Sequence, residues 1–250
     1  MFVKRDISVI YKQSILGPIW YFIQPLFTTV VHSFIFGNLA DISTGGTPHV
    51  LFYFSGTMLW TFFSTVLLTT STCFIDNSNV FGKIYFPRLC VPISIFFTNA
   101  IKLFFQYLCL MVFFLYYLFT SDILKPGLMM LVSPLLILWI GLSATGLGLI
   151  ATSLTTKYRD LRHLLNFALP LAMYATPVVY PLARGLSSKF SVLYYINPVS
   201  APFEYFRIWY YGNGFVPTNM ALISLATSLG LFILGLLCFT HSEKNFVDVV

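Results

Sequence analysis

The chain has 250 residues, of which 58% are hydrophobic and only 9% are charged, and its mean hydropathy is +0.83. One water-facing globule cannot hide so much apolar surface, so the composition excludes an ordinary soluble domain. The net charge of +6 comes from few residues, and no basic stripe remains between the apolar runs, which argues against a nucleic-acid-binding surface.

The first predicted element is a short helix over residues 1–16 that lies in the cytoplasmic membrane interface. Apolar residues recur there at helical spacing, with basic residues between them. The basic groups of Lys4, Arg5 and Lys12 then lie near the lipid head groups, as topology anchors that attract anionic lipid. A frayed basic tail is the alternative to the helix.

Six apolar runs follow, and each is long enough to cross a bilayer as a helix. About 20 apolar residues are needed, because lipid offers the backbone no hydrogen-bond partners. The runs cover approximately residues 19–36, 50–75, 91–119, 126–154, 164–183 and 220–239. We therefore predict an all-α integral membrane protein with six transmembrane helices per subunit.

The whole chain reads as one transmembrane domain over residues 1–250. Its expected parts are the interfacial helix (1–16), helices 1–5 (19–183), an outer gate segment (184–217), helix 6 (218–240) and a cytoplasmic tail (241–250). Basic residues orient it, because cytoplasmic loops carry an excess of Lys and Arg. With both termini inside, nine fall on the cytoplasmic side: Lys4, Arg5, Lys12, Lys83, Arg88, Lys157, Arg159, Arg162 and Lys244. Four fall outside: Lys125, Arg184, Lys189 and Arg207.

The segment over residues 181–217 is too long for a tight turn and is rich in aromatic residues. A loop in water does not expose so many of them, so we expect one or two short re-entrant or interfacial helices between helices 5 and 6, broken near Asn197-Pro198. Glu204 and Arg207 are three residues apart and can pair on one helical face. These four residues form a candidate outer gate.

Lys102 is a charged residue inside the third apolar run. Counting along that run places it near mid-depth, where a bare ammonium is costly. We expect it to face a channel, a partner group or a water defect, or to extend toward the cytoplasm. The sequence leaves these alternatives open.

Several motifs in a fixed order resemble the membrane subunit of polysaccharide ABC exporters, the Wzm-like permeases of O-antigen systems and the related teichoic-acid permeases. The match extends over nearly the whole chain. It rests on Val3-Lys4-Arg5-Asp6, Tyr11-Lys12-Gln13-Ser14, Leu16-Gly17-Pro18-Ile19-Trp20, Gln24-Pro25-Leu26, Lys83-Ile84-Tyr85-Phe86-Pro87-Arg88, Tyr158-Arg159-Asp160, Thr176-Pro177-Val178-Val179-Tyr180-Pro181, Asn197-Pro198, Glu204, Phe206-Arg207 and the tail over residues 243–248.

The resemblance implies a homodimer that encloses a channel in the bacterial inner membrane, with two copies of an ABC ATPase subunit below it. The chain itself has no phosphate-binding loop, so it is expected to be no enzyme and to hold no cofactor, with ATP and magnesium bound by the partner. Two basic cytoplasmic turns are the expected contacts with the ATPase. Their residues are Lys83, Tyr85, Arg88, Tyr158, Arg159 and Asp160. No metal site is expected.

The substrate implied by the resemblance is a glycan linked to a polyprenyl diphosphate, with O-antigen as the leading candidate. Lys4, Arg5 and Lys12 are expected at the depth of that diphosphate, and their role as topology anchors is an equal alternative. Aromatic faces suit sugar rings, and the expected channel aromatics are Trp20, Tyr21, Phe27, Phe34, Tyr174 and Tyr180. Most membrane aromatics are interface or lipid-facing residues, so each has this alternative. Rival functions are a teichoic-acid, capsule, lipid or drug ABC permease and, in another class, a membrane-embedded glycosyl- or acyltransferase. The acidic residues are scattered over the loops, which disfavours the transferase.

Overall fold

The computed structural model describes Val3 and residues 19–77, 87–121, 123–158, 160–187 and 191–246, and all the regular structure in these ranges is helical. The expected interfacial helix, with Lys4, Arg5 and Lys12, lies outside the described residues apart from Val3. The elements in order are α2 (Trp20–His32), η2 (Ser33–Leu39), α3 (His49–Ser71), α4 (Cys73–Asp76), α6 (Cys90–Thr120), η3 (Leu128–Val132), α7 (Ser133–Thr155), α8 (Leu161–Tyr174), α9 (Leu182–Leu186), α10 (Ser191–Ile196), α11 (Ser200–Tyr211) and α12 (Thr218–Phe246).

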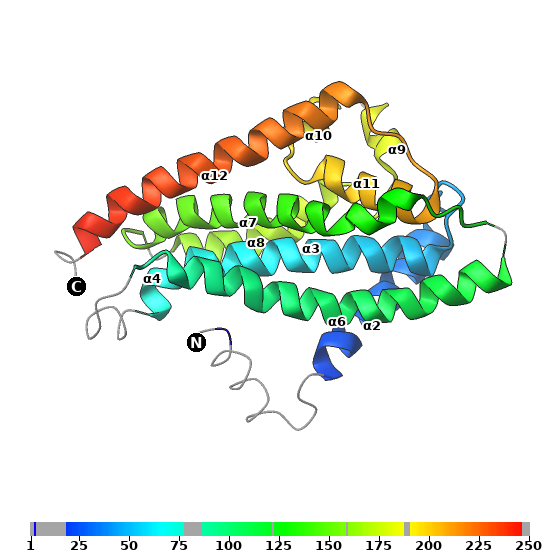
Figure 1. Cartoon of the computed structure of the whole chain (residues 1–250), viewed down its shortest axis with the longest axis horizontal. Coiled ribbons are helices and arrows are strands. Elements are labelled where there is room, and N and C mark those ends of the chain that lie inside the picture. The colour runs from blue at the N-terminus through cyan, green and yellow to red at the C-terminus, as the bar shows by residue number, and fades with distance from the viewer. Residues whose placement is uncertain are drawn as a thin grey trace.

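The long helices form a bundle, with short helices gathered at one end (Figure 1). The α4 turn and the C-terminal end of α12 lie at the opposite end from α9 and α11. Ring stacking between Phe74 and Phe239, with centroids 4.6 Å apart, joins α4 to α12 there. The bundle therefore has two distinct ends, one with the segment between α8 and α12 and one with the turns after α3 and α7.

The α3 helix is the core of the bundle. It is apolar around its whole circumference, as expected for a helix enclosed by others. Helices α2, α6 and α7 pack against it, and ten consecutive residues, 51–60, are buried. The outward faces of α2, α6 and α12 instead expose large apolar side chains, which is the pattern of a lipid-facing surface.

Small residues allow α7 to approach its neighbours closely. A Cβ added at Gly146 would lie 2.7 Å from the backbone of Phe232 on α12, and one added at Gly235 would lie 2.5 Å from the carbonyl oxygen of Gly146. Only glycine fits at this crossing. Close backbone contact of this kind is the usual basis of helix association in lipid, where the hydrophobic effect gives no preference for helix–helix contact.

Five helices are long and apolar enough to cross a membrane, among the residues that the structure describes: residues 20–39, 49–71, 90–120, 128–155 and 218–242. They correspond to five of the six expected runs. The run expected over residues 164–183 is instead divided between α8, whose 14 residues extend about 21 Å, and the turn that follows it. An unbroken fifth crossing is therefore absent from the described chain, because the helix ends at Tyr174 and Pro177 follows.

Candidate functional site

Hydrogen bonds and an ion pair connect parts of the segment between α8 and α12. This segment contains three short helices, α9, α10 and α11, where the sequence predicted one or two. The predicted break is confirmed, because α10 ends at Ile196 and α11 begins at Ser200, with Asn197 and Pro198 between them. The aromatic residues of α11 are largely buried, as expected for a segment that does not extend into water.

Glu204 and Arg207 on α11 form the predicted ion pair. The closest oxygen and nitrogen are 3.3 Å apart, and the side chains are only 2% and 3% exposed. Burial raises the pKa of the Glu204 carboxyl, and the nearby guanidinium acts in the opposite direction. A charge pair so thoroughly removed from water is stable only when its remaining hydrogen-bonding groups are also satisfied.

Arg207 satisfies that condition because its N–H groups donate hydrogen bonds to the turn after α8. Its Nη1 donates to the carbonyl oxygen of Pro177 and its Nη2 to that of Val178, both at 2.7 Å. The guanidinium carbon lies 3.7 Å from the ring centroid of Phe52 on α3. Non-helical backbone inside an apolar bundle needs partners for its carbonyl groups. Arg207 provides them for this turn.

Gly56 on α3 makes room for the same turn. A Cβ at this position would lie 2.7 Å from the carbonyl oxygen of Val178 and 3.0 Å from Nη2 of Arg207. Any larger residue would push the turn and the guanidinium away from α3. The turn, α3 and α11 are therefore packed as one unit around Arg207.

Asn197 and Pro198 connect the junction of α10 and α11 to the rest of the bundle. The Asn197 amide nitrogen donates to the hydroxyl of Thr176 at 3.0 Å. On α12, Ser224 and Ser228 donate to the carbonyl oxygen of Pro198 at 2.9 and 3.2 Å. The four predicted gate residues therefore all bond to the structure around them, but in two groups, one around Arg207 and one around this junction.

The six predicted channel aromatics do not form one cluster. Trp20, Phe27 and Phe34 are exposed on α2 and η2, and Tyr174 is exposed at the end of α8. The ring centroids of Phe36 in η2 and Tyr174 at the end of α8 are 6.3 Å apart, so these two elements are neighbours.

Tyr21 and Tyr180 belong elsewhere. Tyr21 lines a polar pocket described below. The hydroxyl of Tyr180 donates to the carbonyl oxygen of Tyr174 at 2.7 Å and shares a hydrogen bond of 2.8 Å with the hydroxyl of Tyr194. Hydrogen bonds within the subunit therefore explain why a tyrosine occupies position 180.

The turns predicted to contact an ATPase are described only in part, because Lys83, Tyr85 and Arg159 lie outside the described residues. The described part places the two turns at one end of the bundle. The hydroxyl of Thr155, at the end of α7, donates to the carbonyl oxygen of Ser71, at the end of α3, at 2.6 Å. Tyr158 and Asp160 follow on the surface, and Arg88 precedes α6.

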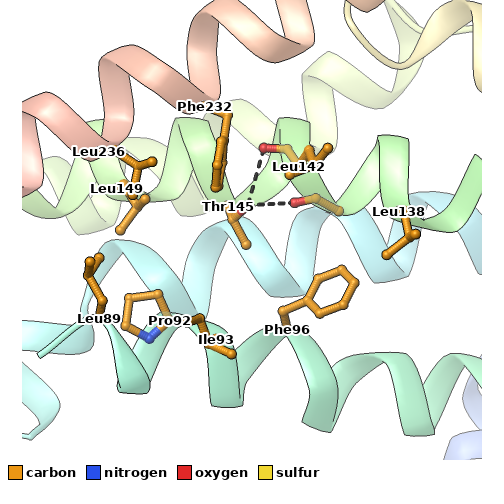
Figure 2. A pocket seen from close by; sticks show the side chains of 11 residues that line it. Leu89, Pro92, Ile93, Phe96, Leu138, Leu142, Thr145, Leu149, Phe232 and Leu236 are labelled. Carbon is orange, nitrogen blue, oxygen red and sulfur yellow. Dashed lines mark hydrogen bonds between the residues drawn. The ribbon is translucent and has the colours of Figure 1, made fainter. Parts of the chain in front are cut away.

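Two cavities lie between the long helices. The first, of about 230 Å³, lies between α6, α7 and α12 (Figure 2). Among the described residues that line it, Thr145 alone has a polar side chain, and its hydroxyl donates within its own helix to the carbonyl oxygens of Gly141 and Leu142. The one hydroxyl proton that the described lining residues offer is therefore already used within α7.

The second cavity, of about 220 Å³, lies between α2, α3 and α6 and includes Lys102. It also contains Gln24, which belongs to one of the family motifs, and Asn99 and Gln106, which no motif includes. A signal was present, because residues 99, 102 and 106 are polar at the i, i+3 and i+7 positions of an apolar run. One helical face of α6 therefore carries a polar stripe.

A family model described as "ABC-2 type transporter" matches residues 1–211 of the chain. The chain is 25% identical over 248 residues to a protein of Klebsiella pneumoniae named O-antigen export system permease protein RfbA, which covers 99% of this chain and 92% of that protein. It is 24% identical over 253 residues to a protein of the same name from Myxococcus xanthus, with 99% and 93% covered. The similarity therefore extends over the whole length.

Proposed function

The chain belongs to the ABC-2 type transporter family, and we propose that it is the permease subunit of an ATP-driven exporter that moves polyprenyl-diphosphate-linked polysaccharide, with O-antigen as the cargo, across the bacterial inner membrane. The observation that carries the proposal is the similarity to two O-antigen export permeases over 99% of the chain. The five long apolar helices support a transport role in a membrane. The choice of O-antigen as the cargo rests on the names of these relatives.

In this proposal, two copies of the chain enclose the path of the glycan, and two copies of an ABC ATPase bind below them. ATP and magnesium belong to the ATPase. The excess of basic residues on the side of the termini supports cytoplasmic N- and C-termini. The exposed apolar and aromatic faces that α2 and α8 show in the described part of the chain support an interface with the second copy or the glycan path.

The end of the bundle with the turns after α3 and α7 is the proposed ATPase contact. The bond between Thr155 and Ser71 links these turns, so a movement applied to one is transmitted to the other. At the opposite end, α9, α10 and α11 form the proposed outer gate. The turn after α8 completes the fifth of six crossings, which Arg207 stabilises by binding the carbonyl groups that the helix leaves open.

A reconstituted system tests the proposal. The chain is placed in proteoliposomes with a candidate ABC ATPase from the same bacterium, and outward movement of carrier-linked O-antigen is measured. We expect export only with both proteins and ATP. Nucleotide turnover by the purified chain alone, or export without a second protein, would contradict it. Export of a teichoic acid, a capsular glycan or a drug in place of O-antigen would keep the permease and reassign the cargo.

The proposed ATPase contact has its own variant in the same assay. Arg88→Ala is expected to reduce export several-fold while leaving the chain in the membrane, because it removes a charged contact at the coupling end. Lys125→Ala, at an exposed cation in the loop between α6 and η3 at the other end, is the matched control. Equal effects of the two substitutions would show that the coupling surface lies elsewhere.

The glycan path is tested by replacing exposed tyrosines. Tyr174→Ala should slow export because it removes an aromatic face beside η2. Tyr116→Ala, at another exposed tyrosine on the outward face of α6, should leave the rate unchanged. If both variants exported glycan at the original rate, sugar stacking at the end of α8 would be excluded.

A further inference from the structure

The cavity between α6, α7 and α12 is an apolar groove in the side of the bundle. Figure 2 shows α6 and α12 on opposite sides of it, with side chains of α7 between them. Its volume of about 230 Å³ exceeds the volume of about 150 Å³ at which an apolar cavity already binds benzene. Apart from Thr145, every described residue that lines it is apolar. Such walls suit a hydrocarbon ligand.

The groove opens at the surface of the bundle. Ile93 on α6 and Leu138 on α7 line it, and their side chains are 55% and 48% exposed. Behind them, Gly141, Thr145 and Leu149 of α7 line the groove and are buried. A molecule therefore reaches the buried floor of the groove from the side of the subunit, between α6 and α7.

The opening lies at the depth of the hydrocarbon core, because α6, α7 and α12 are all long and apolar enough to span a membrane. On α6 the lining extends over the first two turns, from Pro92 to Phe96. On α7 it extends from Leu138 to Leu149, a rise of about 16 Å, which is close to half of a hydrocarbon core of about 30 Å. The groove therefore faces one leaflet, on the side of the bundle where α4 lies.

Close contacts beside the groove prevent the helices from closing it. A Cβ added at Gly141 would collide with the ring of Phe96, so this ring already lies against the backbone of α7. The glycine crossing of Gly146 and Gly235 fixes the distance between α7 and α12 in the same way. Because both neighbours of α7 are held at fixed distances, the space between them is a stable feature of the packing.

Neither water nor empty space is a favourable content for this groove. A buried water needs about two to four polar partners, and the Thr145 hydroxyl already donates to the carbonyl oxygens of Gly141 and Leu142. An empty groove would forfeit the dispersion contacts of all its walls, at a cost that rises with its volume. The hydrocarbon chains of the surrounding leaflet are the only apolar material that the opening faces in a membrane.

We propose that this groove binds one acyl chain of a membrane phospholipid, which stays between the helices while the lipids around the bundle exchange. The chain enters between Ile93 and Leu138 and lies along the floor formed by α7, in contact with the rings of Phe96 and Phe232. It joins α6 to α12 by packing. The site lies apart from the proposed glycan path along α2 and α8 and goes beyond the proposed function.

Native mass spectrometry tests the proposal on the chain purified in a detergent with a rigid steroid body, which does not imitate an acyl chain. Four compounds are titrated: dioleoyl phosphatidylcholine, oleoyl lysophosphatidylcholine, glycerophosphocholine and polyprenyl phosphate. We expect saturable binding of one molecule of either choline lipid, with similar affinity, because a single chain fills the groove. Glycerophosphocholine, which has the head group without a chain, should not bind.

Matched variants locate the bound chain. Thr145→Phe fills the groove from its floor and should weaken binding about tenfold, because the added ring takes the space of the chain. Val112→Phe adds a ring of the same size to the exposed surface of α6 and should leave binding unchanged.

A second pair of variants acts at the opening and carries the test if Thr145→Phe fails to fold. Ile93→Trp blocks the opening and should also weaken binding. Ile223→Trp, at an isoleucine exposed near the other end of α12, is its control and should bind the lipid as the original chain does.

Several results would overturn the assignment. Undiminished binding in both Thr145→Phe and Ile93→Trp would place the lipid elsewhere, as would equal losses in these variants and their controls. Binding of glycerophosphocholine as tight as that of the lipids would show that the head group is recognised. Tighter binding of polyprenyl phosphate than of either choline lipid would replace the acyl chain by an isoprenoid chain. Because no transport is measured, failure of the proposed export function would leave these results unaffected.

Discussion

Arg207 and Lys102 are both cations inside an apolar bundle, yet their surroundings differ. Arg207 binds two backbone carbonyl groups, a carboxylate and a ring face, and it is 3% exposed. Lys102 donates to the Asn99 amide and lies over the Tyr21 ring at the side of a cavity, next to Gln106, whose side chain has no hydrogen bond among the described residues. The first cation is enclosed by the fold and stabilises it, whereas the second borders a cavity.

The most direct test of this comparison is a substitution of Arg207. Arg207→Met leaves Glu204 as a buried charge and two carbonyl groups without donors, so we expect the chain to lose about 3–5 kcal/mol of stability. Thermal unfolding in detergent measures this, with Arg184→Met as the control because Arg184 is exposed on α9. Similar unfolding temperatures for the two variants would show that the bonds of Arg207 do not stabilise the turn after α8.

The next largest loss of stability is expected at Gly56, which packs against the turn that Arg207 binds. Gly56→Ala places a Cβ 2.7 Å from the carbonyl oxygen of Val178, and the turn must move away from α3. We expect a loss of about 1–3 kcal/mol, the usual cost of overpacking. Gly230→Ala on α12 is the control, since nothing lies within 4 Å of its added Cβ. That variant should be neutral or slightly more stable, because alanine favours a helix.

A smaller effect is expected at Tyr180. Tyr180→Phe removes a hydroxyl that donates to the carbonyl oxygen of Tyr174 and bonds with Tyr194, which should cost about 1 kcal/mol. Tyr116→Phe, at an exposed tyrosine of α6, is the matched control. An unchanged unfolding temperature in Tyr180→Phe would favour a role for its ring in the glycan path over a structural one.

Much of the fold could be predicted because lipid imposes simple rules on length and polarity. Five of the expected crossings appear as long helices, and the Glu204–Arg207 pair and the break at Asn197-Pro198 follow from local spacing. The end of α8 could not be predicted from hydropathy. The residues after Tyr174 are apolar but not helical, and their carbonyl groups depend on an arginine 30 residues away in sequence. Hydropathy carries no record of such long-range bonds.

The polar cavity between α2, α3 and α6 could not be predicted for a related reason. The charge of Lys102 marks it in the sequence, but its position along α6 does not show that the first turns of α2 lie beside it. Gln24 and Gln106 belong to different apolar runs, and only packing brings them together. The stripe at residues 99, 102 and 106 was visible in the sequence, while its partner helix was not.

The smallest change in stability is expected at Gln106, beside Lys102, and it tests the second member of the comparison. Gln106→Leu replaces an amide whose side chain has no hydrogen bond among the described residues by an apolar side chain of similar size, so no described bond is lost and desolvation becomes easier. We expect unfolding within about 0.5 kcal/mol of the original, or slightly more stable. Asn99→Leu is the matched variant, because this amide accepts from Lys102 and donates to Ile95. It should destabilise the chain by about 1–3 kcal/mol, since the ammonium loses its acceptor. Greater destabilisation by Gln106→Leu than by Asn99→Leu would mean that Gln106 supports the fold, and the distinction between the two cation sites would no longer hold.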